Sequence, residues 1–244
     1  MVEVLTKELK NKSLKDQLVF LAEEYKGKIA FSTSFGLGDQ VITDVIFSNN
    51  IPINIFTLDT GRLFEDTYKV WDKTLKKYKK KIIPFFPNRE DVEKMVNEKG
   101  INSFYDSPEN RNECCRIRKV EPLNRALEDM EIWITGLRAE QSETRTELAF
   151  FEENETYNLI KFNPLLKWSL DDIIKHLKAN DVPYNDLYNK GFISIGCAPC
   201  TRAVKLGEEI RAGRWWWESK EKKECGIHVS QNTIPLITAK KINL

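Results

Sequence analysis

The chain has 244 residues, 41% of them hydrophobic, and its 38 basic side chains almost balance 37 acidic ones. That length supports one large domain with a sizeable core. The net charge of +1 argues against a protein whose overall field attracts nucleic acid. No apolar run has the length of a membrane span, and the charged segment MVEVLTKELKNKSLK lacks the apolar region of a signal peptide. We therefore expect a cytoplasmic protein that binds neither nucleic acid nor membrane, and we leave a homo-oligomer open.

Strand-like and helix-like segments alternate along most of the chain. In chain order we predict a strand over 28–33, a helix over 40–49, a strand over 53–58, a helix over 63–80, a strand over 81–86, helices over 90–98 and 116–128, a strand over 131–135, a hairpin region over 150–162 and a helix over 171–179. This alternation is typical of an α/β fold, an open parallel sheet with helices on both faces. Periodicity fades from about Arg214, so we predict an α/β domain over residues 1–213 and a mobile C-terminal tail over 214–244.

Polar loops follow three of the expected strands. They are STSFGLGD from Ser32 to Asp39, LDTGR around Asp59, and TGLRAEQS after Thr135, with Arg145 beyond it. In open α/β sheets the carboxyl ends of the strands form the binding crevice. Small residues and a helix N-terminus suit anionic oxygens, and arginines pair with phosphate or sulfate. The alternative is a set of ordinary solvated turns with serine caps and surface ion pairs.

Four of the five cysteines form two pairs. The vicinal Cys114-Cys115 and the Cys197-x-x-Cys200 motif supply four thiolates, the number that closes a zinc or an iron–sulfur site. In a reducing compartment, paired cysteines favour metal binding or catalysis over structural disulfides. For the vicinal pair, the alternative is two unrelated buried thiols.

Cys225 is left over and lies in the expected tail. Lys220, Lys222 and Lys223 favour its thiolate form, and His228 lies three residues further on, where it could assist. This pattern indicates a reactive cysteine. The preceding segment RAGRWWWE contains three consecutive tryptophans, which are costly to expose, so a packed edge is their plainest interpretation.

These motifs together resemble a known family. STSFGLGD, LDTGR, ECCRIRK, TGLRAEQS, GCAPCTR, RAGRWWWE and KECGIH occur in the order seen in assimilatory adenylyl-sulfate (APS) reductases, a branch of the phosphoadenylyl-sulfate (PAPS) reductase family. The resemblance extends from about Phe31 to His228. PAPS-specific relatives keep the terminal ECG(I/L)H but lack the CC and CxxC pairs. One departure is Gly38, where many relatives carry an acidic residue.

The resemblance implies a fold like that of the adenine nucleotide alpha-hydrolases, and it implies the roles of particular residues. Cys114, Cys115, Cys197 and Cys200 would hold a [4Fe-4S] cluster with Lys119 beside it, and Cys225 would be the nucleophile. The substrate would contact Ser32, Ser34, Gly36, Asp39, Asp59, Thr60, Gly61, Arg62 and Gly136, with Arg138, Arg145, Arg211 and Arg214 at its phosphosulfate. The reaction would yield AMP and an S-sulfocysteine, from which thioredoxin or glutaredoxin releases sulfite.

Three other functions stay open at this point. A PAPS reductase would use the 3′-phosphorylated nucleotide. An ATP-using adenylyltransferase or thiolase of the same sheet would need a Ser-Gly-Gly-x-Asp-Ser loop, which STSFGLGD does not match. A zinc-ribbon module for nucleic acid would have two Cys-x-x-Cys pairs and a basic face, whereas here one pair is vicinal and the net charge is near zero.

Overall fold

A computed structural model of the chain describes residues 1–141 and 148–218. One six-stranded sheet runs through its centre, in the order β3-β2-β1-β4-β6-β5. The strands are β1 (Ile29–Ser32), β2 (Asn54–Leu58), β3 (Ile83–Phe85), β4 (Ile132–Ile134), β5 (Phe151–Asn154) and β6 (Leu159–Phe162). All neighbouring strands pair in parallel except β5 and β6, which pair antiparallel. The predicted α/β fold and the hairpin near Asn154 are confirmed, and the sheet has one antiparallel edge strand.

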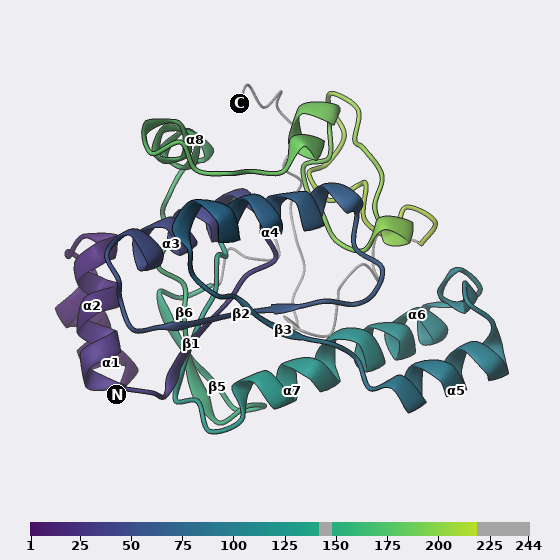
Figure 1. The fold of residues 1–244 in the computed structure, drawn as a ribbon, viewed down its shortest axis with the longest axis horizontal. Coiled ribbons are helices and arrows are strands. Elements are labelled where there is room, and N and C mark those ends of the chain that lie inside the picture. Colours follow the sequence, from purple (N-terminus) through teal and green to yellow (C-terminus); the bar gives the residue numbers. More distant parts are fainter. Residues whose placement is uncertain (142–147, 219–244) are drawn as a thin grey trace.

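Helices cover both faces of this sheet (Figure 1). They are α1 (Val2–Leu9), α2 (Leu14–Glu24), α3 (Leu37–Ser48), α4 (Glu65–Tyr78), α5 (Arg89–Lys99), α6 (Pro108–Cys115), α7 (Glu121–Leu127) and α8 (Leu170–Ala179). The first four and α8 lie on one side, and α5, α6 and α7 lie on the other (Figure 1). None of the described helices is both long and apolar enough to cross a membrane.

The alternation of side chains along β1 explains the two layers. Ile29 and Phe31 join the large core that contains α3, whereas Ala30 joins the smaller core formed with Leu123 and Ala126 of α7. Successive side chains of a strand point to opposite faces, so a short strand that is apolar throughout must be covered twice. This is why β1 is buried along almost its whole length.

Two parts of the predicted helix pattern need correction. Helices α1 and α2 were not predicted from the sequence, although Ser13 caps α2 and both helices add leucines to the large core. The helix expected over 116–128 is the end of a longer helical run. This run starts at Pro108, passes through a π-helix over Arg116–Val120 and continues as α7. The vicinal cysteines therefore lie inside this run, at the end of α6, and not before its start.

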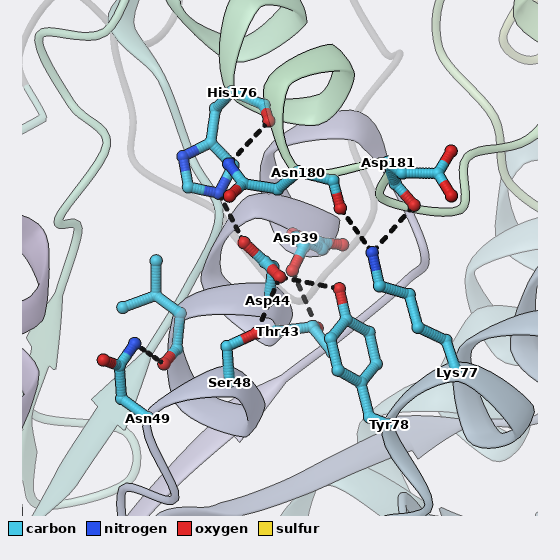
Figure 2. A network of polar contacts seen from close by, with 11 residues as sticks. Asp39, Thr43, Asp44, Ser48, Asn49, Lys77, Tyr78, His176, Asn180 and Asp181 are labelled. Carbon is cyan, nitrogen blue, oxygen red and sulfur yellow. Dashed lines mark hydrogen bonds and ion pairs between the residues drawn. The ribbon is translucent and has the colours of Figure 1, made fainter.

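Helix α3 is fastened along its length to its neighbours (Figure 2). The carboxylate of Asp44 accepts hydrogen bonds from Tyr78 of α4 at 2.8 Å and Ser48 at 3.0 Å, and it lies 2.7 Å from Nε2 of His176 on α8. One turn earlier, Gln40 Nε2 donates to Thr74 at 2.9 Å and to a backbone carbonyl beyond α8 at 2.7 Å. These contacts fix α3, and with it the loop at its N-terminus.

The expected boundary at residue 214 falls inside packed structure. Arg214 forms a β-bridge with Thr201, the amide of Trp215 donates to the carbonyl of Cys200 at 3.2 Å, and Trp215 is 1% exposed. Residues 214–218 thus pack against the segment that carries Cys197 and Cys200. Residues 219–244 lie outside the described part of the chain, and the mobility predicted for them stays a prediction.

Candidate functional site

A cavity of about 280 Å³ opens at the carboxyl ends of β1, β2 and β4. Its lining comes from the β1–α3 loop, the ends of β2 and β4, the segment over 193–197, and the segment around Arg211 and Arg214. This is the edge at which α/β sheets bind ligands. The sequence predicted that three loops meet there, and the structure brings residues of all three to one cavity.

Asp39 shapes the first of these loops from inside. Its Oδ2 accepts from the amide and the hydroxyl of Ser34, both at 2.7 Å, and from the amide of Gly36 at 3.3 Å. These bonds cap the N-terminus of α3 and hold Phe35 at a φ of 59°. One oxygen of Asp39 is therefore committed to the loop, and Ser34, Gly36 and the start of α3 face the cavity.

The end of β4 approaches α3 so closely that a side chain at position 136 would collide with Asp39, and position 38 is tight as well. A Cβ on Gly136 would lie 2.0 Å from Asp39 Oδ1. A Cβ on Gly38 would lie 3.2 Å from the carbonyl oxygen of Gly136 and 3.3 Å from Leu165. Gly38, the position where the sequence departs from many relatives, is thus where α3 packs against backbone.

Only part of the LDTGR loop lines this cavity. Thr60 does, whereas Asp59 accepts from the amide of Gly61 at 2.9 Å and from Tyr68 at 2.8 Å. Gly61 has a φ of 69°, which a turn of this kind requires. Arg62 points elsewhere: it donates to Asn102 at 3.0 Å, and its guanidinium carbon lies 4.9 Å from the ring of Phe104.

The predicted arginines fall into two groups. Arg211 and Arg214 line the cavity, and a Cβ on Gly196 would lie 2.4 Å from a guanidinium nitrogen of Arg214. Arg138 does not line it. Its guanidinium is buried, donates to the carbonyl of Trp168 at 3.2 Å and to Glu140 at 3.3 Å, and burial lowers its pKa. Arg145 lies outside the described residues.

The four paired cysteines line a second, smaller cavity of about 20 Å³. Cys114 and Cys115 reach it from the end of α6, and Cys197 and Cys200 from a 3₁₀ turn over Ala198–Cys200. The basic residues around it are Arg62, Arg111, Arg118, Lys119 and Arg214. The π-helix turn directly after the vicinal cysteines carries Arg118 and Lys119 to this wall. Lys119 lines both cavities.

The cysteines fit a positively charged metal centre by their chemistry. Burial raises the pKa of the Cys114 thiol, and it raises that of Cys200 to about 12. Four thiolates in such a place need a cationic partner. Among the described residues, no group of three or more His, Cys, Asp or Glu side chains converges closely enough for a metal-ion site.

Hydrogen-bond donors around the small cavity also suit sulfur ligands. The hydroxyl of Thr60 lies 3.3 Å from the sulfur of Cys197. Within the described part of the chain, Nε of Arg118 and Nε1 of Trp215 are buried without an acceptor, and both residues line this cavity. Buried N–H groups without acceptors are costly, so these donors are available to a group that is bound there.

Comparison with known proteins decides the family. The model of the phosphoadenosine phosphosulfate reductase domain matches residues 28–203. The chain belongs to this family. It is 50% identical over 220 residues to the adenosine 5'-phosphosulfate reductase of Neisseria meningitidis serogroup B, covering 90% of this chain and 89% of that one. The enzyme of the same name from Burkholderia cepacia is 47% identical over 218 residues, 89% of this chain and 87% of that one. The resemblance inferred from the motifs is confirmed.

Solved structures agree on the fold of this family. A PAPS reductase from Candida auris, crystallised as a phosphate complex, superposes with a TM-score of 0.70 at 28% identity, covering 83% of this chain and 96% of that one. An FMN adenylyltransferase from Candida glabrata superposes with a TM-score of 0.54 at 16% identity. The second likeness shows a shared fold alone.

Some lining residues were not among the predicted site residues. Tyr188, from the 3₁₀ helix over Asp186–Lys190, places its hydroxyl 3.4 Å from the amide of Leu37 at the start of α3, and Trp133 and Ile193 also line the cavity. Their types are those of core residues, so no sequence signal separated them. Trp215 had a signal, the triple tryptophan, which we interpreted as packing. Cys225 and His228 lie outside the described residues.

Proposed function

We propose that the chain reduces adenosine 5'-phosphosulfate to sulfite and AMP through a covalent intermediate on Cys225. The observation that carries this proposal is the close relatedness to adenosine 5'-phosphosulfate reductases over nine tenths of the chain. The geometry supports it, because a nucleotide-sized cavity and a four-cysteine cavity share Lys119 as a common wall. An ATP-using adenylyltransferase receives no such support, since the likeness to one is of fold only.

The cavity offers different surroundings to the two ends of such a substrate. Leu58, Leu123 and Trp133 provide an apolar part that suits the adenine ring, and Lys119, Arg211 and Arg214 provide cations for the phosphosulfate. The N-terminus of α3 also lines this cavity, and the positive end of a helix favours anionic oxygens. The nucleotide would thus lie with its sulfonate toward the cysteine cavity.

The first step is a displacement at sulfur. The Cys225 thiolate attacks the sulfonate sulfur, a new S–S bond forms, and the bond from sulfur to the phosphate oxygen breaks. AMP leaves with that electron pair, and the arginines stabilise the charge that develops on its phosphate. The product on the enzyme is S-sulfocysteine.

The second step needs a dithiol, for which we propose thioredoxin or glutaredoxin. One of its thiolates attacks the sulfur of Cys225, sulfite leaves, and a mixed disulfide remains. The second thiol of the partner then closes its own disulfide and restores the Cys225 thiol. The two electrons that reduce the sulfonate to sulfite therefore come from the dithiol.

We propose that Cys114, Cys115, Cys197 and Cys200 hold a [4Fe-4S] cluster. When bound, the cluster supplies electrostatic and structural support near the sulfonate. Of this chain's own residues, Lys119 lies on the wall between the cluster cavity and the nucleotide cavity, where its charge serves both. Four thiolates are also a zinc ligand set, and iron analysis separates the two metals.

One experiment tests the reaction. Holoenzyme is mixed with APS or with PAPS, with thioredoxin present, and sulfite is measured. We expect a higher specificity constant for APS, since a 3′-phosphate needs an additional basic pocket. Without reductant, mass spectrometry should find one sulfonate on the peptide that carries Cys225, and thioredoxin should remove it. Equal specificity constants would contradict the substrate preference, and an adduct on another residue would contradict the mechanism.

A further inference from the structure

A buried ion pair joins the cysteine-bearing helix to the end of the described chain. Arg111, on α6, donates from Nε to Glu218 Oε1 at 2.6 Å, although 107 positions separate the two residues in sequence. Their side chains are 2% and 4% exposed. Glu218 is the last described residue before the segment 219–244, which carries Cys225.

The same guanidinium has two further contacts. Its central carbon lies 4.8 Å from the ring of Trp215, and it interacts with the thiol of Cys115. Trp215 is itself bound through its amide to the carbonyl of Cys200 at 3.2 Å. Arg111 therefore contacts one predicted cluster ligand directly, and it holds two residues of the segment that leads to Cys225.

An ion pair in this position is not the simplest way to fill space. Taking both charges out of water has a large desolvation cost, and apolar residues of similar volume pack as well or better. The ion pair instead fixes the position of Glu218, because a charged hydrogen bond has a specific geometry. Cys225 comes seven residues after Glu218, so an extended chain lets it reach no more than about 25 Å from that point.

We propose that Arg111 and Glu218 anchor the start of the C-terminal segment to the four-cysteine site and so set the point from which Cys225 reaches the substrate. The proposal rests on the proposed function. In it, Arg111 and Glu218 are positioning residues that touch neither the nucleotide nor the reacting sulfur. Assembly of the cysteine site and delivery of the nucleophile are then coupled through one guanidinium.

The substitution Glu218→Gln tests the anchor, since it removes the charge and keeps the size. In single-turnover reactions of holoenzyme with APS and no reductant, we expect sulfonation of Cys225 to slow by roughly 10- to 100-fold, as for other misplaced reactive groups. Iron content should be unchanged, and so should APS affinity when it is measured in a Cys225→Ser background. A wild-type rate in the iron-loaded variant overturns the proposal, as does a slower rate that lower APS affinity explains fully.

Glu208→Gln is the matched control. Glu208 pairs with Arg202 at 2.9 Å in the same segment, but the two side chains are 31% and 37% exposed. The same chemical change there should leave the sulfonation rate at the wild-type value. An equal slowing in both variants would mean that any lost charge in this segment has the effect, and the specific anchor would be rejected.

A second measurement does not depend on the reaction. Trypsin cleavage after Lys220, Lys222 and Lys223 in the holoprotein should be faster in Glu218→Gln than in wild type or Glu208→Gln. Unchanged cleavage overturns the anchor even where APS proves not to be the substrate. If Glu218→Gln does not hold iron, Glu218→Asp replaces it, because it keeps the charge and shortens the side chain. It should show slower sulfonation and faster cleavage, and wild-type behaviour in both would reject the proposal.

Discussion

The two cavities that meet at Lys119 are built in different ways. The nucleotide cavity is formed by strand ends and the start of α3, and Asp44 and Gln40 fasten that helix to α4 and to the chain around α8. The cysteine cavity is closed by a segment with only a 3₁₀ turn and one β-bridge, which is held by side chains such as Arg111 and Trp215. Backbone and buried helices tolerate a single side-chain change better than such a segment does. We therefore expect substitutions on the two sides to have separable effects.

The largest effect should come from the proposed nucleophile. Cys225→Ser should abolish sulfite release, by about 10³-fold or more as for other removed nucleophiles. It should leave APS binding and the iron–sulfur spectrum intact, because the described residues that line the two cavities are unchanged. Sulfite assays, calorimetric binding of APS and visible absorbance measure the three properties. Sulfite production near the wild-type rate would reject Cys225 as nucleophile.

Next in size, Cys197→Ser should disrupt chiefly the cysteine side, although Cys197 also lines the nucleotide cavity. We expect anaerobically purified wild type to carry about four irons per chain, and the variant to lose both iron and activity, because it removes a thiolate next to Thr60. AMP should still bind, since the strand ends and the start of α3 that line the nucleotide cavity are unchanged. Iron analysis and AMP titration test the separation. An iron-free variant with full activity would refute the cluster assignment.

The sequence was most informative where chemistry depends on residue type and spacing. The two cysteine pairs in the sequence predicted that Cys114, Cys115, Cys197 and Cys200 act together, and these four residues line one cavity. The strand-loop pattern likewise placed Ser34 and Thr60 at one edge of the sheet. Spacing does not reveal which way a side chain points. Asp59, Arg62 and Arg138 lie in the expected loops but form hydrogen bonds with other parts of the protein. The lining residues Tyr188 and Trp133 look like core residues in sequence.

A smaller effect should come from a substitution in the wall of the nucleotide cavity. Gly136→Ala places a Cβ 2.0 Å from Asp39 Oδ1, so Asp39 or the end of β4 must move. We expect a loss of about 1–3 kcal/mol of stability, as for other overpacked sites, or a fall in Tm of roughly 2–12 °C. APS affinity should fall with it, whereas iron content should stay at the wild-type value.

Gly36→Ala is the control for that experiment. It lies in the β1–α3 loop and contacts the same Asp39 through its amide, but its added Cβ would meet its nearest atoms at 3.5 Å or more. Its Tm should fall less than that of Gly136→Ala. Equal Tm values for the two variants would show that the close approach of α3 and β4 does not stabilise the nucleotide cavity. Loss of iron from Gly136→Ala without loss of APS affinity would show the same.

The smallest effect concerns stability alone, at the network of Figure 2. Burial by itself would raise the pKa of Asp44, but hydrogen bonds from His176, Tyr78 and Ser48 outweigh it and leave that pKa lowered. A carboxyl whose pKa is lower in the folded protein stabilises it above the unfolded pKa of about 3.9, and this stabilisation is lost as pH falls through the folded value. Asp44→Asn should therefore destabilise the protein by about 1–3 kcal/mol at neutral pH, and the Tm difference from wild type should shrink below about pH 4.

The control is Asp72→Asn, at an exposed ion pair with Lys76, which should change stability by less than about 0.5 kcal/mol at neutral pH. A gap between Asp44→Asn and wild type that stays constant from pH 7 to pH 3 would show that the Asp44 carboxylate does not fasten α3 through its charge.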